Sequence, residues 1–488
     1  LYDANIFYPH DYTLAFSEAN IVAGIVGVPA WVLTGNAYTT HNLAVLFAFA
    51  TAFLGMWALA RYVVEDDTVA IVAGIMFAFC PYMQTHTAHI QLLMSGGIPL
   101  AMLLTHRLAD APSTRSGVLL GLTLAAQALS CAYYGIFAGL MVGYAVLFFA
   151  VGRPLWTTRA YWQAVAIAAA TAIVPVVPFF IPYVLIQQGQ GFRRTIEDAA
   201  TYSANAQSYL ASPAHAHNWM LAITAHWPRW IEALFPGFLA SALGVAGLVL
   251  VGRRLESGPR RHGEAWLLYG SLGLMAFWAS FGPHAGLYSL LFRIPLFSFL
   301  RAPSRFGLVV VMALAVFAAM ALQVFLRRFG SRPRTIAVAI VAALVVAELN
   351  VLPFPWERAQ RIPAPYRVLA RLPRGPVAEF PYYGARPVYH LHTQYMVFST
   401  AHWLPMINGY SDHIPQDFRD TAEALDTFPS HDAFAVMRRA RIRYLGVHWD
   451  MYGARADGIR QGMVRYEQYL RPIASDDTMT LYEVIGFP

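Results

Sequence analysis

Long apolar runs with almost no charge fill the first 352 positions of the chain. The clearest run, residues 306–326, holds 21 mostly apolar residues, enough to cross a hydrocarbon core of about 30 Å at about 1.5 Å per residue. Several others are shorter than ~20 residues, which indicates irregular spans buried among neighbouring helices. The pattern predicts a mainly α protein, a polytopic bundle of about ten transmembrane helices. The nine further runs are residues 42–63, 68–83, 90–105, 117–132, 135–151, 161–186, 233–252, 265–282 and 335–352.

A different pattern begins at residue 353 and continues to residue 488. Short runs typical of strands are VAEFPYY, MVFST, IRYLGVHW and TLYEVIG. They alternate with two stretches of helical spacing, FRDTAEALDTF and HDAFAVMRRARI. The sequence therefore predicts a transmembrane domain over residues 1–352 and a small α/β or α+β domain over residues 353–488.

The composition agrees with a membrane protein, because 57% of the residues are hydrophobic and only 12% are charged. All 34 basic side chains are arginines. If residues 1–36 lie outside, the inner loops hold 13 arginines and the outer loops before residue 353 hold 6. This bias predicts a multi-pass protein with an extracytoplasmic C-terminal domain. The net charge of +7 then lies mainly on loops that meet anionic lipid, and it indicates no nucleic-acid partner.

The N-terminal 36 residues read as an outer loop with one short apolar stretch, broken at Pro29, that lies on the membrane or dips into it. Because the chain opens on Leu1 within this loop, we expect a first spanning helix upstream. Cys80 and Cys131 both lie in apolar runs, which favours small buried side chains over a disulfide.

Ionisable side chains gather at the outer ends of the predicted spans, and Glu348 is the main exception within a span. A secondary transporter tends to place such groups near the membrane midplane, so this distribution favours chemistry at the external face. The first loop supplies Asp3, Asp11 and Glu18, any of which can act as a base toward an acceptor hydroxyl. Solvated loop acids or helix caps are the alternative. Glu18 directly precedes the apolar stretch, which places it at the membrane boundary.

His86 and His89, in QTHTAHIQ, are spaced three apart. On a helix this spacing puts both on one face, where they can bind a substrate or a metal. Two histidines are too few to establish a metal site, so a divalent metal is possible but unsupported. A polar cap at the end of a short span is the alternative.

Arg301 and Arg305 flank Pro303 and Ser304 at the start of the clearest span. Proline in the first turn and serine at the cap predict a helix start, where free amides and two guanidiniums can hold phosphate. Arginines that reach lipid phosphates are the alternative. Arg193 and Arg194 form a second possible phosphate clamp in the long outer loop.

The segment AHWLPMINGYSDH, residues 401–413, combines turn residues with rings and polar groups. Trp403, Asn408 and Tyr410 can stack on a sugar or hydrogen-bond to it, whereas a purely structural turn explains Asn-Gly equally well. The sequence shows no phosphate-binding glycine loop, zinc motif or nucleophile elbow, which argues against soluble nucleotide chemistry.

Six short strings together resemble the bacterial integral-membrane glycosyltransferases of the GT-C superfamily, in particular large members with an external C-terminal domain. The strings are FYPHDYTLAFSE, TGNAYTTHNL, THTAHIQ, SCAYYGIF, FLRAPSRF and INGYS, between residue 3 and about residue 413. The resemblance implies a multi-pass protein of the bacterial inner (plasma) membrane.

The resemblance also implies the chemistry. Such enzymes take a sugar from a polyprenyl-phosphate carrier and pass it, with inversion, to a glycan, lipid or protein acceptor outside the cytoplasm. An acid of the first external loop, often near the end of the first helix, acts as base. We expect the matching acid either upstream of Leu1 or, within the sequence given, at Asp3, Asp11 or Glu18. Arg301 and Arg305 would face the lipid phosphate, and His86 and His89 would line the cavity.

Two other functions stay open at this stage. A transporter or flippase for a lipid-linked glycan can also have an arginine-lined cavity, and it would move the labelled lipid without transferring its sugar. A non-catalytic, membrane-anchored glycan-binding protein would tolerate amide replacement of every first-loop acid.

Overall fold

The computed structural model describes residues 2–190, 195–226, 232–255, 258–294, 300–354 and 358–488. It divides into two compact units. The membrane unit comprises Asn20–Phe180 and Arg193–Trp356, and the C-terminal unit comprises Leu1–Ala19, Ile181–Phe192 and Glu357–Pro488. The first loop and the end of one long helix thus group with the C-terminal residues, although the sequence pattern assigned both segments to the transmembrane domain.

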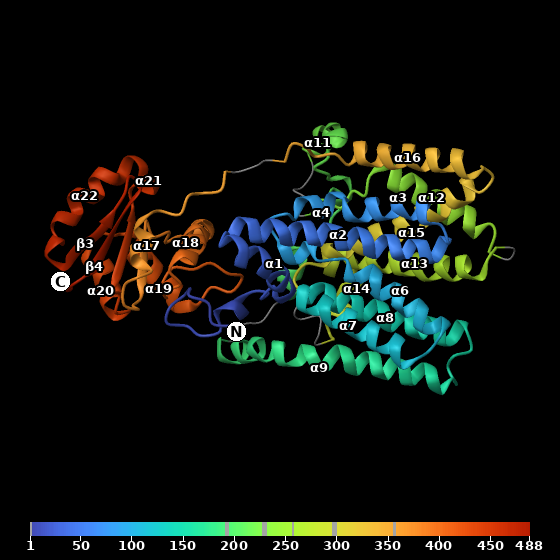
Figure 1. Cartoon of the computed structure of the whole chain (residues 1–488), viewed down its shortest axis with the longest axis horizontal. Helices are drawn as coiled ribbons and strands as arrows, with labels where there is room; N and C mark the ends of the chain where they lie inside the picture. The colour runs from blue at the N-terminus through green and yellow to red at the C-terminus, as the bar shows by residue number, and fades with distance from the viewer. Residues whose placement is uncertain (1, 191–194, 227–231, 256–257, 295–299, 355–357) are drawn as a thin grey trace. The chain divides into compact units, whose positions relative to one another are not determined.

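Each of the ten predicted runs lies mainly on a helix (Figure 1). The longer helices are α1 (Ile21–Thr34), α2 (Ala37–Val64), α3 (Asp67–Ala78), α6 (Gly97–Asp110), α7 (Thr114–Ser130), α8 (Ala132–Gly152), α9 (Arg159–Gln190), α12 (Phe238–Gly252), α13 (Arg260–Ser280), α15 (Gly307–Leu326) and α16 (Ser331–Glu348). Short helices connect them: α4 (Pro81–Thr85), α5 (Ile90–Leu93), α10 (Ile196–Thr201), α11 (Asn218–Thr224) and α14 (Leu287–Leu291). Helix α1 continues through Pro29, so the predicted break there was wrong.

Six segments of the described chain are long and apolar enough to cross a membrane, which makes this a multi-pass membrane protein. They are Ala37–Val64, Asp67–Thr85, Ile90–Asp110, Ala132–Gly152, Arg159–Gln188 and Pro303–Leu326. The predicted helical bundle is confirmed.

Helix α15 lies at the centre of the membrane unit and packs against α3, α12 and α13. Most of its side chains are buried, which explains why it is apolar on every face. Small residues allow the closest approach, because a Cβ at Gly247 of α12 would collide with the backbone carbonyl of Phe317. The helix therefore connects the two ends of the unit as one continuous, closely packed element.

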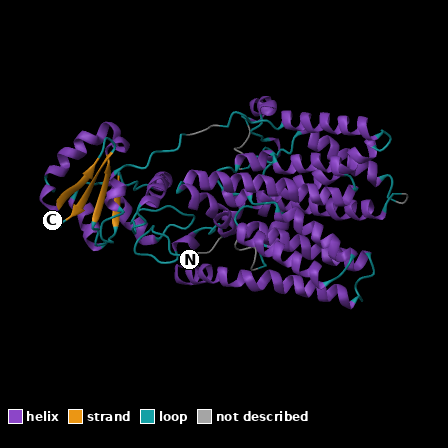
Figure 2. Cartoon of the chain, viewed as in Figure 1, coloured by secondary structure: helices purple, strands orange, loops and turns teal. Residues whose placement is uncertain are grey.

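The C-terminal unit contains the predicted small mixed domain, and Figure 2 shows its four strands together. The sheet has the order β1-β2-β4-β3, in which β1 and β2 are parallel and the other neighbours antiparallel. The strands are β1 (Val377–Phe380), β2 (Tyr444–His448), β3 (Leu470–Ser475) and β4 (Met479–Val484). The helices are α17 (Pro365–Leu369), α18 (Thr393–Phe398), α19 (Gln416–Asp426), α20 (His431–Arg439), α21 (Trp449–Tyr452) and α22 (Ala456–Val464).

Three of the four predicted strands are present, whereas the run MVFST is helical, in α18 and the turn that follows it. The register explains one glycine of β2. Glu379 of β1 lies opposite Gly446, and a Cβ on Gly446 would collide with the buried Glu379 carboxylate. That carboxylate also lies 3.0 Å from Nε2 of His448.

Candidate functional site

His86 and His89 occupy the turn that connects α4 to α5, as the C-cap of one helix and the N-cap of the next. Their spacing predicted that they share one helix face, which is wrong, because they cap two different helices. Their ring centroids are 6.0 Å apart across the turn. Nδ1 of His86 lies 2.7 Å from the Tyr82 carbonyl, which would otherwise accept from the His86 backbone amide. That amide donates to the Met83 carbonyl instead, and α4 ends here. The turn thus brings two imidazoles to one end of the bundle, which the arginine bias predicts to be external.

The second ring nitrogen of His86 contacts an acid that the sequence pattern did not single out. Nε2 lies 3.1 Å from Oε2 of Glu232, and the two side chains are only 10% and 11% exposed. Both ring nitrogens of His86 therefore lie within hydrogen-bonding distance of an oxygen atom. The pair fixes the orientation of the imidazole and connects the α4–α5 turn to the segment before α12.

Two buried tyrosines lie beside this pair. Tyr134 comes from the start of α8, where Cys131 interrupts the helical path with an extended backbone. Its hydroxyl donates to the hydroxyl of Tyr82 at 2.9 Å and lies 3.1 Å from the carbonyl of Leu92. The charges of Glu232 and Arg305 both act on Tyr82. The two hydroxyls therefore extend the group of buried polar side chains around the His86–Glu232 pair.

Arg305 lies in a 3-10 turn, Pro303–Phe306, that leads into α15. Its guanidinium carbon is 4.3 Å from the centroid of the Tyr133 ring. Among the described residues, its buried Nε has no hydrogen-bond partner. Stacking on a ring fixes the plane of a guanidinium and leaves its N–H groups directed sideways, which suits a phosphate or carboxylate. Arg305 is thus a positioned cation with a free donor.

Arg301 is held in a similar way, with its guanidinium carbon 5.1 Å from the Tyr202 ring centroid. Its backbone amide donates to the Tyr133 hydroxyl at 2.8 Å, so one tyrosine contacts both arginines. The predicted cap by Ser304 was wrong. The turn starts at Pro303 after Ala302, and no described group bonds to the buried Ser304 hydroxyl. Proline at the first position forces the preceding residue out of the helical region, which moves the helix start upstream.

The electrostatics of the cluster favour an anion. The pKa of His89 is lowered by partial burial and then by the charges of His86, Arg305 and Arg301, while Glu232 opposes the shift. A neutral His89 can still hydrogen-bond without adding charge. In the ranges that the structure describes, no group of three or more His, Cys, Asp or Glu side chains is arranged to hold a metal ion. We call His86, His89, Glu232, Arg305, Tyr82 and Tyr134 the His86–Arg305 cluster.

Glu348, the acid within a predicted span, has a structural partner instead. Its carboxylate accepts from the backbone amides of Phe238 and Leu239, the first residues of α12. Nε2 of His217 lies 3.1 Å from the same carboxylate. A carboxylate at a helix N-terminus compensates the unpaired amides and the helix dipole. Glu348 thus joins α16 to the start of α12.

The three predicted first-loop bases belong to the C-terminal unit. Asp3 is exposed, and its carboxylate accepts from the amide of Tyr12 at 2.7 Å. Asp11 is exposed, and Glu18 is half-buried, directly before Ala19, whose amide donates to the Tyr183 hydroxyl at 2.9 Å. Their catalytic role stays a prediction.

The predicted sugar-binding segment lies against the first loop within the same unit. The amide of Phe7 donates to the carbonyl of Asn408, and the Phe7 ring packs edge-on against Phe418. The Asn408 side chain is fully buried. Its amide oxygen accepts from the Glu379 backbone amide and its amide nitrogen donates to the Glu379 carbonyl, which gives it a structural role. Trp403 and Tyr410 are 55% and 40% exposed, so their rings remain accessible to a ligand. Arg193 and Arg194 fall outside the described residues.

Several solved structures are similar to the chain, and three of them are described here. The Archaeoglobus fulgidus oligosaccharyltransferase, in complex with zinc and sulfate, is 14% identical with a TM-score of 0.48, and the match covers 98% of this chain and 66% of that one. ArnT from Cupriavidus metallidurans in the apo state is 14% identical with a TM-score of 0.44, covering 95% of this chain and 87% of that one. ArnT bound to undecaprenyl phosphate is 13% identical with a TM-score of 0.46, covering 98% and 94%.

The chain thus spans 66% of the length of the oligosaccharyltransferase. No protein-family model matches the chain, and a search of curated proteins found no match.

Proposed function

We propose that the chain is a membrane glycosyltransferase that moves a sugar from a polyprenyl-phosphate carrier to an acceptor outside the cytoplasm. The observation that carries the proposal is Arg305, a cation stacked on Tyr133 with a buried, unused donor beside the His86–Glu232 pair. A guanidinium with an open N–H is suited to the phosphate of a lipid-linked sugar, whose isoprenoid tail has to remain in the bilayer.

The reaction requires the acceptor oxygen to attack the anomeric carbon while the bond from that carbon to the carrier phosphate breaks. Charge grows on the departing phosphate, and Arg305 and Arg301 stabilise it. A first-loop carboxylate, Glu18, Asp11 or Asp3, takes the acceptor proton, and a single displacement inverts the anomeric carbon. His86 and His89 line the donor pocket, with Glu232 holding His86 in place.

The accessible rings of the C-terminal unit are suited to the acceptor. Trp403 and Tyr410 stack on a glycan, whereas the buried Asn408 holds the turn that presents them. We place the protein in the bacterial inner membrane with this unit outside the cytoplasm, in agreement with the arginine bias of the loops.

The test uses the full chain in lipid nanodiscs with a polyprenyl-phosphate sugar that carries a label on the sugar. Transfer of label to an added glycan or lipid acceptor, with release of polyprenyl phosphate, supports the proposal. Arg305→Gln should lower transfer roughly 10–100-fold, and Arg293→Gln, which removes an exposed arginine from outside the cluster, should leave it unchanged. Movement of the intact lipid across proteoliposomes without transfer would show a flippase instead.

A further inference from the structure

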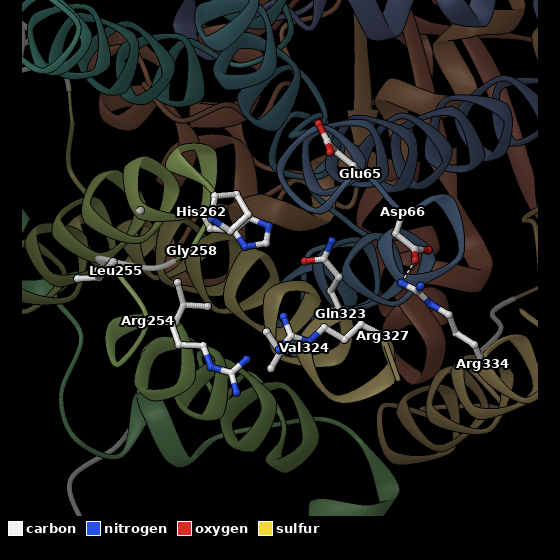
Figure 3. A pocket seen from close by; sticks show the side chains of 13 residues that line it. Glu65, Asp66, Arg254, Leu255, Gly258, His262, Gln323, Val324, Arg327 and Arg334 are labelled. Carbon is white, nitrogen blue, oxygen red and sulfur yellow. Dashed lines mark hydrogen bonds and ion pairs between the residues drawn. The ribbon is translucent and has the colours of Figure 1, made fainter. Parts of the chain in front are cut away.

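A second polar site lies at the opposite end of the membrane unit from the His86–Arg305 cluster. Helix α15 begins just after Arg305, and Arg327 follows its last residue. A cavity of about 450 Å³ opens there, between the α2–α3, α12–α13 and α15–α16 connections (Figure 3). Its volume is within the usual range of small-ligand sites, about 300–1,000 Å³. By the arginine bias, all three connections are internal.

The acids of this cavity are already paired. Asp66 accepts from the Arg334 guanidinium, and Glu65 lies 2.5 Å from Nη1 of Arg261. Neither Arg254 nor Arg327 has an ion-pair partner among the residues that the structure describes. Two guanidiniums without a described counter-charge therefore face one hollow.

The remaining polar groups suit an anion with several oxygens. Figure 3 shows Arg254, His262 and Arg327 directed toward the same space from three sides. The pKa of His262 is lowered, chiefly by burial, so this ring is a neutral hydrogen-bond partner rather than a third cation. The Gln323 amide is used, because it donates to the Val64 carbonyl. Val251, Leu255 and Val324 supply apolar wall.

We propose that this cavity binds a phosphate group between Arg254 and Arg327, carried either by an anionic phospholipid headgroup or by a soluble phosphorylated compound. Guanidiniums bind phosphate in bidentate fashion, and basic pockets between helices at the cytoplasmic face are suited to anionic headgroups. The site shares no residue with the His86–Arg305 cluster. The proposed phosphate binding can therefore be tested independently of the proposed transferase activity.

The test measures binding to the purified full chain in zwitterionic detergent, by native mass spectrometry and by the rise in unfolding temperature. The probes are dioctanoyl phosphatidylglycerol, dioctanoyl phosphatidylcholine and inorganic phosphate. Arg254→Gln/Arg327→Gln should weaken binding of the anionic probe at least tenfold. The control Arg253→Gln/Arg328→Gln removes two exposed charges from the same two connections but not from the cavity wall, and should change binding less than twofold.

The source of the phosphate follows from the probes. Saturable binding of phosphatidylglycerol alone identifies a headgroup, and competition by inorganic phosphate identifies a soluble ligand; both support the site. Equal losses in the two double variants would overturn it in favour of diffuse surface charge. Binding of phosphatidylcholine as tight as that of phosphatidylglycerol, or no saturable binding, would also overturn it.

A measurement on the unmodified sequence covers the case in which the cavity variant does not fold. Phenylglyoxal reacts with accessible guanidiniums. Bound dioctanoyl phosphatidylglycerol or inorganic phosphate should protect Arg254 and Arg327 from this reaction but leave Arg253 and Arg328 reactive. Protection of all four or of none contradicts the proposal.

Discussion

Glu232 contacts His86 through Oε2 and Nε2 at 3.1 Å, and both side chains are almost completely shielded from solvent. The contact joins two connections that are far apart in the sequence, the α4–α5 turn and the approach to α12. The His86 ring also bonds to the Tyr82 carbonyl at the end of α4. The Glu232 carboxylate therefore helps to orient the ring that closes the α4–α5 turn. We therefore expect Glu232 to position His86 in the proposed donor site.

Glu232→Gln keeps the size of the side chain and removes its charge. We expect the variant to raise the KM for the lipid-linked donor and to lower kcat/KM by about tenfold, the effect of weakening one buried charged hydrogen bond by about 1.5 kcal/mol. Kinetics at fixed acceptor concentration measure this. Glu197→Gln, an exposed acid of α10, is the matched control and should match wild type. Equal kinetics for both variants would remove Glu232 from the site.

Arg305→Ala should impair the use of the donor far more than it impairs folding. Loss of one charge-assisted contact to phosphate, about 1.5–3 kcal/mol, corresponds to a donor kcat/KM roughly 10–100-fold lower. Arg305→Lys should recover only part of this, because an ammonium cannot reproduce the planar contact with Tyr133. Turnover and unfolding temperature are measured together. Wild-type turnover in the alanine variant would show that Arg305 does not contact the carrier phosphate.

Glu18→Gln tests the base. A general base contributes about 10²–10⁴-fold, so we expect kcat to fall by at least 100-fold while donor binding stays the same. Asp3→Asn and Asp11→Asn, measured in parallel, show whether another acid of the first loop has the role. If all three amide variants transfer sugar at the wild-type rate, the base lies elsewhere and a first-loop carboxylate is not catalytic.

The C-terminal unit should lose stability in mild acid. Burial lowers the pKa of His392 and of His402 to about 4, from an ordinary value of 6.5. The unfolded chain takes up these protons near pH 6.5 and the folded unit only near pH 4, so stability is complete above pH 6.5 and falls as the pH drops toward 4. A shift of this size corresponds to at most about 3 kcal/mol per histidine.

Hydrogen exchange of the β1 and β2 amides in the full chain, corrected for intrinsic rates, measures this loss. His402→Gln should make the profile less steep between pH 6.5 and 4, because only His392 then contributes. His390→Gln, an exposed histidine of the same unit, should leave it unchanged. A wild-type profile that is flat over this interval would contradict the prediction.

The helices of the membrane unit could be predicted because an apolar run of sufficient length has few other stable forms. The C-terminal strands were harder. β3 was missed because it combines Arg471, Pro472 and a register shift, which hide the alternation that identifies a strand. MVFST has strand-forming residues but lies in a helix, since Tyr395 and Phe398 bury on one side of it. Tertiary packing overrides propensity in such short runs.

The candidate site was only partly predictable for a related reason. Arg301, Arg305, His86 and His89 stood out as polar residues at span ends. Glu232 also lies at the end of a predicted span, directly before the apolar run 233–252 that contains α12. This location at a span end could have identified it as a candidate. Its partner could not be inferred, because pairing with His86 depends on how α3, α12 and α15 pack. The unused donor of Arg305 likewise depends on Tyr133, which the sequence reads as an ordinary aromatic.

No ionisable side chain interrupts the 21 residues between Arg305 and Arg327. At about 1.5 Å per residue these arginines lie about 33 Å apart, roughly four Debye lengths at physiological ionic strength. Two anions bound at these ends repel each other by only about 0.5 kcal/mol at an effective dielectric constant of about 20. Stronger coupling between the two ends requires α15 to slide or rotate against α12. At Gly247 the two helices are so close that a Cβ would already collide with the Phe317 carbonyl.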